Sequence, residues 1–279
     1  KIKSDAKSEE ILISYFSHAC AEIKTGQINI ITDPWLIGPA FTRGWWLKHR
    51  PPANWRERVI DADMIYISHN HSDHLNEHTL KEIARINPEV PIVVPNFKSS
   101  TCQDLIKEYG LKNISVHDFN KWYSLGPDTK YMLLIDGTGR DDSGILIEHK
   151  NYRILNTVDC SNLNSGNLPE ADVLLTSFAG GASGYPVCWE ELYGQEGIRK
   201  IVRKNKVSII KHLIDHVKAV NPEIIIPFAG YFHEKHKHDN KIRILNEKNT
   251  PYEIEEKLKY YPEITGKVWV PEEVHLYTL

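Results

Sequence analysis

Short apolar segments separated by polar turns fill the first part of the chain, a pattern that predicts β-strands. ILISYF is rich in β-branched and aromatic residues, and the apolar run INIITDPW ends at the turn signal Asp33-Pro34. ADMIYISH has the pattern of a third buried strand and ends at a cluster of histidines. The N-terminal part therefore predicts a sheet whose strands end in turns that carry polar residues.

Helical and extended patterns alternate after the histidine cluster. Apolar residues recur at helical spacing in LNEHTLKEIARI, in SSTCQDLIKEYG and in a long stretch from about Glu190 to Val220. Further strands are predicted at VPIVVP, NISVHDF, KYMLLIDG, GILIEHK, YRILNTVD, ADVLLTSF and PEIIIPFAGYF. This order predicts an α/β fold in which two central mixed sheets are flanked by helices. We expect residues 11–279 to form one domain, and residues 1–10 to be disordered or a trimmed start.

Composition narrows the classes of function. The 279 residues are 41% hydrophobic and 25% charged, with a net charge of −3, so no basic surface is expected for nucleic acid. The apolar runs are too short to span a membrane, and KIKSDAKSEE lacks the apolar core of a signal peptide. No pair among the four cysteines has CxxC spacing. We expect a cytoplasmic protein that contacts neither nucleic acid nor membrane.

The segment SHNHSDHL carries the strongest chemical signal. It supplies four nitrogen or oxygen donors within six residues, His69, His71, Asp73 and His74, at the end of a predicted buried strand. Partly desolvated histidine and aspartate side chains are costly unless they are paired or bind a cation. The spacing favours a metal site over a polar loop with incidental histidines.

This HxHxDH pattern resembles that of the metallo-β-lactamase superfamily. The resemblance implies an αββα sandwich and one or two metal ions, which lower the pKa of a bound water or activate another small ligand. It also implies an aspartate that bridges the metals at the end of a later strand. Asp159 in ILNTVDC fits this role, although a strand-end aspartate can also cap a turn. We assign catalytic roles to Asp73 and Asp159.

Two ligands implied by the superfamily pattern are displaced in this sequence. Where a third histidine is expected, the stretch DGTGRDDSG offers Asp141 or Asp142, which are equally well explained as solvated turn residues. A carboxylate there, with His69 and His71, gives the two-histidine-one-carboxylate set associated with iron(II). The site of the final histidine holds Phe228 and Ala229. The candidates for its replacement are therefore His236 and then His233, with His238 more consistent with a surface position and His18 with a packing or supporting role.

Longer strings narrow the resemblance. DPWLIGPAFTRGWWL, ISHNHSDHL, ILNTVDC, SFAGGASGYP and PFAGYF resemble the catalytic domain of the CMP-N-acetylneuraminate hydroxylase family. The resemblance implies an O₂-dependent iron monooxygenase that acts on a nucleotide sugar and receives electrons from a Rieske cluster. No cysteine here has the C-x-H or C-x-x-H spacing of a Rieske site, so we expect no such cluster in this chain. Either a separate protein supplies electrons, or the substrate does, or the chemistry is not oxygenation.

The same strings suggest a pocket for a small-molecule substrate, which can be anionic. The loop of Arg43 and Trp46 is basic and aromatic, which suits an anionic or planar ligand, although the tryptophans can equally be packing residues. Gly181 belongs to the glycine-rich FAGGASG, which either lets backbone approach a ligand or is a flexible turn. Tyr185 and Tyr231 lie in the resembling strings and are further candidates.

Three functions are consistent with these features. The favoured one is a metal-dependent oxidoreductase or oxygenase, with iron preferred, acting on a small polar metabolite. The second is a dinuclear zinc or manganese hydrolase of a phosphoester, lactone or amide. The third is a metal-binding module without catalysis. The all-nitrogen and oxygen donor set and the closer resemblance favour the first.

Overall fold

The chain folds into an alternation of strands and helices. The strands are β1 (Ile11–Ser17), β2 (Cys20–Thr25), β3 (Ile28–Thr32), β4 (Trp45–Leu47), β5 (Met64–Tyr66), β6 (Ile92–Pro95), β7 (Ile114–His117), β8 (Trp122–Ser124), β9 (Thr129–Ile135), β10 (Ser143–His149), β11 (Tyr152–Asn156), β12 (Val173–Ser177), β13 (Ile224–Phe228), β14 (Phe232–Glu234), β15 (Lys267–Val268) and β16 (Leu276–Thr278). The helices are α1 (Trp55–Ile60), α2 (Glu77–Ile86), α3 (Thr101–Glu108), α4 (Glu190–Val220), α5 (Asn240–Leu245) and α6 (Pro251–Leu258).

Two seven-stranded sheets pack against each other in this computed structural model, which describes residues 11–180, 184–272 and 276–278. The first sheet has the order β16-β1-β2-β3-β5-β6-β7, and the second has the order β15-β13-β12-β11-β10-β9-β8. In each sheet one half is antiparallel and the other half is parallel. Residues 1–10, which we expect to be disordered or a trimmed start, lie outside the described part.

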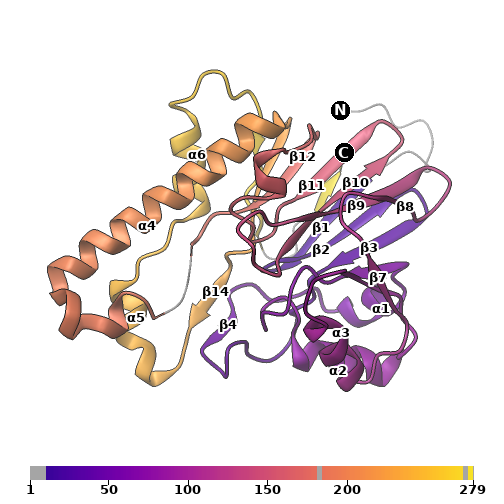
Figure 1. Cartoon of the computed structure of the whole chain (residues 1–279), viewed down its shortest axis with the longest axis horizontal. Coiled ribbons are helices and arrows are strands. Elements are labelled where there is room, and N and C mark those ends of the chain that lie inside the picture. The colour runs from indigo at the N-terminus through magenta and orange to yellow at the C-terminus, as the bar shows by residue number, and fades with distance from the viewer. Residues whose placement is uncertain (1–10, 181–183, 273–275, 279) are drawn as a thin grey trace.

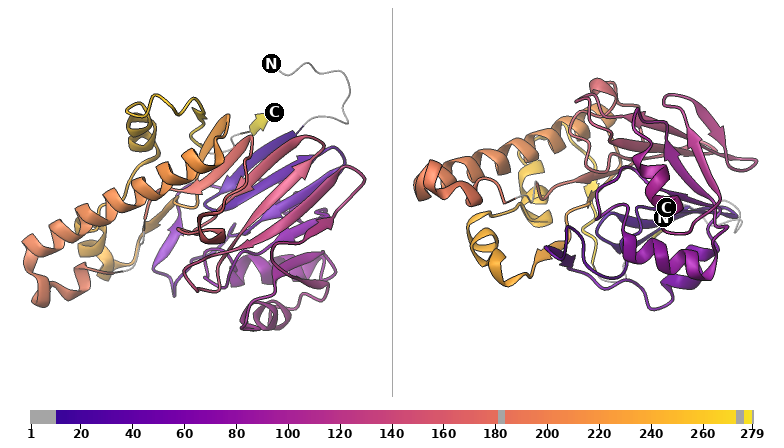
Figure 2. Two further views of the ribbon diagram at one scale, coloured as in Figure 1. Left: turned by 45° about the horizontal axis from the view of Figure 1, so that its top comes forward. Right: turned by 60° about the horizontal axis from the view of Figure 1, so that its bottom comes forward.

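Helices cover the outer faces of both sheets (Figures 1 and 2). Helices α1, α2 and α3 bury apolar side chains against the first sheet, among them Val59, Leu80 and Ile106. Helix α4 buries Leu213 and Val217 against the second sheet, and its N-terminal part projects beyond the sheets beside α5 (Figure 1). The predicted αββα sandwich with two mixed sheets is therefore confirmed. No helix in the described ranges is long and apolar enough to cross a lipid bilayer.

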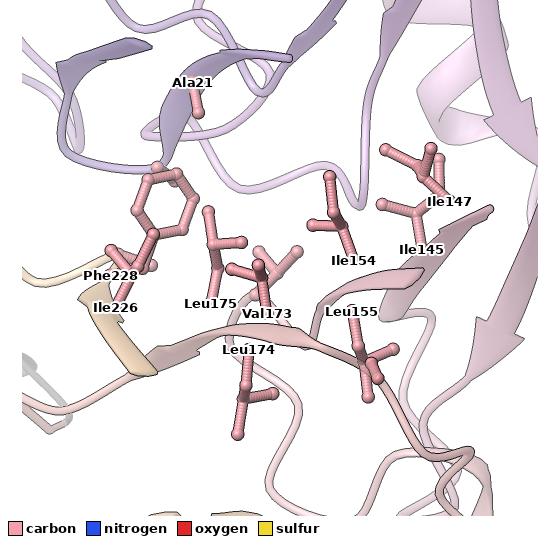
Figure 3. Packing of buried hydrophobic residues seen from close by; sticks show 14 of the residues in the cluster. Ala21, Ile145, Ile147, Ile154, Leu155, Val173, Leu174, Leu175, Ile226 and Phe228 are labelled. Carbon is pink, nitrogen blue, oxygen red and sulfur yellow. The ribbon is translucent and has the colours of Figure 1, made fainter. Parts of the chain in front are cut away.

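The central strands β10, β12 and β13 of the second sheet are buried on both faces, which explains their continuous apolar runs. On β12, Val173 and Leu175 point toward Ala21 of the first sheet, whereas Leu174 points to the opposite side (Figure 3). The side chains of Val173, Leu174 and Leu175 are almost completely buried. Because successive side chains of a strand point to opposite faces, one run fills both the space between the sheets and the layer under α4.

Helix ends fix the segments that approach the site. Asn76 caps α2 by accepting a hydrogen bond from the Thr79 backbone N–H, at 3.0 Å. Helix α4 ends at Asn221, whose φ of 52° lies in the left-handed region and whose N–H donates to the Val217 carbonyl. A small third sheet pairs β4 with β14 and joins the loop after β3 to the segment after β13. Sequence patterns had not indicated this small sheet.

Candidate metal centre

The HNHSDH segment forms a tight turn between β5 and α2. Its backbone is held by the N–H groups of His74 and Leu75, which both donate to the His71 carbonyl at 3.0 and 2.8 Å. The Asn76 side chain donates to the Ser72 carbonyl at 2.9 Å and so ties the turn to the start of α2. Because β3, β5 and β6 run parallel, the turn lies at the carboxyl edge of the first sheet, where α/β proteins commonly bind ligands.

One group of candidate ligands consists of His69, His71 and Asp159. One donor atom from each of the three lies within 4.8 Å of the others. The His69 Nε2 and His71 Nδ1 atoms are 2.9 Å apart. Asp159 follows β11 and belongs to the second sheet, so the group joins both halves of the sandwich. The structure thus brings together three of the residues singled out in the sequence.

A second group, within the same distance limit, consists of His18, Asp73 and His74. Asp73 Oδ2 lies 3.2 Å from His18 Nε2 and 3.5 Å from His74 Nε2. Asp159 Oδ2 lies 3.3 Å from the same nitrogen of His74 and therefore stands between the two groups. The role of Asp159 as a bridge between two metal ions stays a prediction.

Several donor atoms of the second group have no hydrogen-bond partner. Within the described residues, His18 Nδ1, Asp73 Oδ1 and His74 Nε2 are buried side-chain atoms of this kind. Unpaired buried polar atoms are costly and uncommon in folded proteins. A cation bound beside Asp73 and His74 would satisfy the unpaired atoms of these two residues, so the residues present fit a metal ion.

Asp33 orients two of the histidines. Its Oδ2 accepts a hydrogen bond from His74 Nδ1 at 2.9 Å and from the Ser68 hydroxyl at 2.7 Å, and its Oδ1 accepts the Ser68 N–H at 2.7 Å. The Ser68 oxygen in turn lies 2.9 Å from His69 Nδ1 and accepts a hydrogen bond from it. With both Nδ1 atoms engaged, the Nε2 atoms of His69 and His74 are left to face a cation.

Sequence reasoning treated Asp33 as part of a turn and did not assign Asp33 or Ser68 to the site. The only available signal was a polar residue at the end of a buried strand beside a predicted metal turn. That signal does not specify which side chain Asp33 reaches, because the partner is set by the parallel pairing of β3 and β5.

Electrostatics of the centre favour a bound positive charge. Burial, together with the neighbouring His74, lowers the pKa of His69 to about 3, so this ring is neutral and keeps a lone pair. Burial also disfavours a charged His74, but Asp73, Asp159 and Asp33 outweigh it and raise the pKa of His74 well above its usual value. The carboxylates therefore hold a positive charge at His74, where a metal ion can replace the proton.

Of the two aspartates proposed as a third ligand, the structure brings Asp142 to the centre and leaves Asp141 exposed. Asp142 Oδ1 lies 3.3 Å from His69 Nδ1, the nitrogen that faces away from His71, and accepts the Ser143 N–H and the Cys160 thiol. Burial and then the charge of Asp159 raise the pKa of Asp142 to about 7. In this geometry Asp142 supports His69 and is outside both candidate ligand groups.

The structure does not bring the proposed replacements for the final histidine to the centre. His233 lies on β14 opposite Trp46, and His236 is exposed at the start of the short 3-10 helix Lys237–Asp239, where its ring contacts His238. Neither belongs to a candidate ligand group. Both follow the end of β13, where the chain turns outward to form β14, and this turn moves them away from the centre. The donor found beside Asp73 and His74 is His18.

The four described substrate candidates, Arg43, Trp46, Tyr185 and Tyr231, are outside the lining of the cavity at the centre. Trp46 is exposed and donates its indole N–H to the Arg43 carbonyl. Tyr185 is exposed and lies shortly before α4. Tyr231 is buried and donates its hydroxyl to the Pro227 carbonyl, which reflects a role in the core. Gly181 lies outside the described residues.

A cavity of about 830 Å³ opens above the candidate ligands. His18, His71, Asp73 and Asp159 line its floor. Part of the lining is aromatic, and another part, the polar wall, comes from the end of β12 and from α4. The aromatic residues are Phe41, Trp45 and Phe232, and the polar ones are Thr176, Ser208, His212 and His216. Both the volume and the mixture of apolar walls and few polar groups are typical of a small-molecule site.

Family comparison agrees with the fold. Residues 12–229 match the family model described as a β-lactamase superfamily domain. The chain therefore belongs to the β-lactamase superfamily.

Individual relatives are more specific. The chain is 44% identical to the cytidine monophosphate-N-acetylneuraminic acid hydroxylase of Asterias rubens over 268 residues, which cover 94% of this chain and 41% of the relative. It is 40% identical to the enzyme of the same name from Mus musculus over 266 residues, which cover 94% of this chain and 46% of the relative. The resemblance seen in the sequence is thus confirmed, and the chain spans less than half the length of these curated relatives.

Solved structures show the same fold in proteins with different chemistry. CmlA, a diiron β-hydroxylase from Streptomyces venezuelae, matches with a TM-score of 0.57 and 16% identity, over 97% of this chain and 54% of CmlA. An isothiocyanate hydrolase from Delia radicum gut bacteria matches with a TM-score of 0.61 and 12% identity, over 95% and 98% of the two chains. At such low identity these similarities establish the fold alone.

Proposed function

We propose that the chain is the catalytic part of a metal-dependent hydroxylase that acts on CMP-N-acetylneuraminic acid or a closely related nucleotide sugar. The relatives that bear this activity in their names are 40–44% identical to nearly the whole chain. The observation that carries the proposal is the pair of candidate ligand groups, joined by Asp159, on the floor of the cavity.

The donor set supports iron as the metal. His69, His71 and Asp159 would hold the ion with nitrogen and oxygen atoms, and two histidines with one carboxylate is the arrangement associated with iron(II) oxygenases. When bound, iron supplies the one-electron and O₂ chemistry that protein side chains lack. Zinc or manganese in the same donors is the alternative, and it would accompany hydrolysis.

The surrounding residues position the ligands and keep the site dry. Asp33 and Ser68 orient His74 and His69 through the hydrogen bonds described above. Phe41 lies edge-on to His71, with ring centroids 5.9 Å apart, and packs against Trp45 at 4.5 Å. These rings limit access of water to the most exposed histidine of the centre, which protects a reactive site from side reactions.

The polar wall is suited to hydroxyl groups and an anionic substituent. His216 is buried, with Nδ1 3.4 Å from the Thr176 hydroxyl, and His212 Nδ1 lies 3.2 Å from the Ser161 carbonyl. Arg140 adds a guanidinium at the rim of the cavity. In the proposed function these groups bind the sugar and place the bond to be hydroxylated over the centre.

Electrons and location complete the proposal. We assign the supply of electrons to a separate donor protein or domain, since the cysteine spacing in these 279 residues does not match a Rieske site. A cytoplasmic, reducing location is supported by the four cysteines, all of which are free and three of which are buried.

A single-turnover experiment tests the function. Iron-loaded protein is reduced anaerobically, mixed with CMP-N-acetylneuraminic acid and exposed to isotopically heavy oxygen gas, and the product is analysed by mass spectrometry. We expect one heavy oxygen atom in the nucleotide sugar. His236→Ala should behave like the wild type, and Asp159→Ala should yield no product. Substrate cleavage without O₂ would instead indicate a hydrolase.

A further inference from the structure

The turn between β1 and β2 carries a histidine where turn chemistry favours another residue. Ser17 pairs with Cys20, so His18 and Ala19 form a two-residue hairpin loop. His18 has a φ of 45°, and a positive φ at the first loop position is usually supplied by glycine. For a non-glycine residue such a conformation is strained and persists where the surrounding structure holds it in place.

The surroundings hold His18 in one position. Its N–H donates to the Tyr15 hydroxyl at 2.9 Å, and its carbonyl accepts the Ala229 N–H at 3.2 Å. The ring packs edge-on against Trp35 and Phe232, with centroid distances of 5.2 and 5.9 Å. The hydrogen bond from Ala229 shows that this turn lies against the end of β13, where sequence comparison had placed the missing final histidine.

We infer that His18 is a metal ligand, which enters from the β1–β2 turn and closes a second metal position with Asp73, His74 and Asp159. This inference rests on the proposed metal centre. In it, His18 takes the place of the superfamily's final histidine, for which the sequence had suggested His236 and then His233.

Distances between the donor atoms fit one ion. Ligand atoms bound at ~2.0–2.2 Å to a common ion lie roughly 3.0–3.5 Å apart. The contacts observed around Asp73 Oδ2, His74 Nε2, His18 Nε2 and Asp159 Oδ2 are 3.2, 3.5 and 3.3 Å. These three contacts link donors from three separate parts of the chain at the spacing that a shared cation requires, and one ligand atom each of His18, Asp73 and His74 lie within 4.8 Å of one another.

The burial of His18 and its unpaired ring nitrogen distinguish it from a residue that serves only packing. The side chain of His18 is 1% exposed, and its Nδ1 has no hydrogen-bond partner. A buried histidine that serves only packing normally has both ring nitrogens satisfied or one of them facing solvent. The nitrogen placed to bind the ion is Nε2, which lies 3.2 Å from Asp73 Oδ2, and His18 lines the cavity above the candidate ligands.

Metal stoichiometry tests the inference without reference to activity. Metal-free wild-type protein and the variants His18→Ala and His18→Asn are titrated with Co²⁺, and bound metal is counted by absorption and elemental analysis. Asparagine tolerates the left-handed conformation and protects against simple misfolding of the turn. His236→Ala is the matched control, a histidine that the sequence also suggested and that the structure places outside the centre.

We expect two equivalents for the wild type and for His236→Ala. For both His18 variants we expect one tight equivalent and a second weakened by more than about 100-fold. Added imidazole, which can enter through the cavity, should restore the second equivalent in His18→Ala. Two tight equivalents in both His18 variants, or only one in the wild type, would overturn the role of His18. A wild type that binds no Co²⁺ tightly would instead refute the metal centre on which the proposed function depends.

Discussion

Replacement of Asp33 by asparagine tests whether the metal centre depends on one buried carboxylate. Asp33 is fully buried and accepts hydrogen bonds from His74 Nδ1, from the Ser68 hydroxyl and from the Ser68 N–H. Asparagine keeps the size of the side chain but turns one acceptor into a donor. His74 and His69 then lose the groups that fix their tautomers with Nε2 toward the cation.

The magnitude follows from the two histidines involved. Loss of a partner that orients a metal-bound histidine typically weakens metal affinity 10–100-fold, or about 1.4–2.8 kcal/mol. Asp33 acts on His74 directly and on His69 through Ser68, so we expect metal affinity to fall by about 100-fold. The unpaired Ser68 groups should also lower the free energy of unfolding by roughly 1–3 kcal/mol.

Competition with a chelator of known affinity measures the metal dissociation constant, and circular dichroism verifies folding. Asp172→Asn is the control, because Asp172 accepts the Arg153 N–H at 2.7 Å just before β12, at the opposite end of that strand from the cavity-lining Thr176 and Ser177, and should leave affinity unchanged. A folded Asp33→Asn protein whose affinity lies within threefold of the wild type would refute the orienting role.

Three further predictions concern stability. Leu174→Ala leaves a cavity at a fully buried position between β12 and α4 and should lower the free energy of unfolding by about 2–5 kcal/mol in a denaturant titration. Leu192→Ala, at an exposed position near the start of α4, should change it little, and equal effects of the two substitutions would contradict the packing described. Arg58→Met leaves the buried Glu22 carboxylate with only Lys24 at 3.6 Å and should destabilise by about 3 kcal/mol, and a neutral result would mean that the pair is not needed. Burial lowers the pKa of His149 below its usual ~6.5, so the unfolded chain takes up a proton that the folded chain refuses as pH falls through that value. Stability should therefore decline below about pH 6.5, less steeply in His149→Gln, and parallel profiles would exclude His149 as a contributor.

Local patterns were sufficient to predict most of the fold. The runs VLLTS and IIIPF became β12 and β13, and helical spacing predicted α4 from Glu190 to Val220 with its end before Pro222. These elements are set by periodicity and by turn residues, which act over a few positions. The pairing of β4 with β14 joins segments about 185 residues apart and has no local signal.

The site was predictable where its residues are adjacent in sequence. His69, His71, Asp73 and His74 share one turn, so their spacing alone predicted a metal site there. The contribution of His18 depends on how the β1–β2 turn packs against Ala229. The orienting role of Asp33 depends on the register of β3 with β5. Both are properties of tertiary packing, and sequence spacing therefore placed the last histidine at His236 instead.

Anomalous X-ray scattering at metal absorption edges, from crystals of protein purified without added metal, tests the metal centre most directly. We predict a peak at the iron edge within coordination distance of His69, His71 and Asp159, and a second peak beside His18, Asp73 and His74. Crystals in which these side chains are ordered, bond one another and show no peak at any transition-metal edge would contradict it.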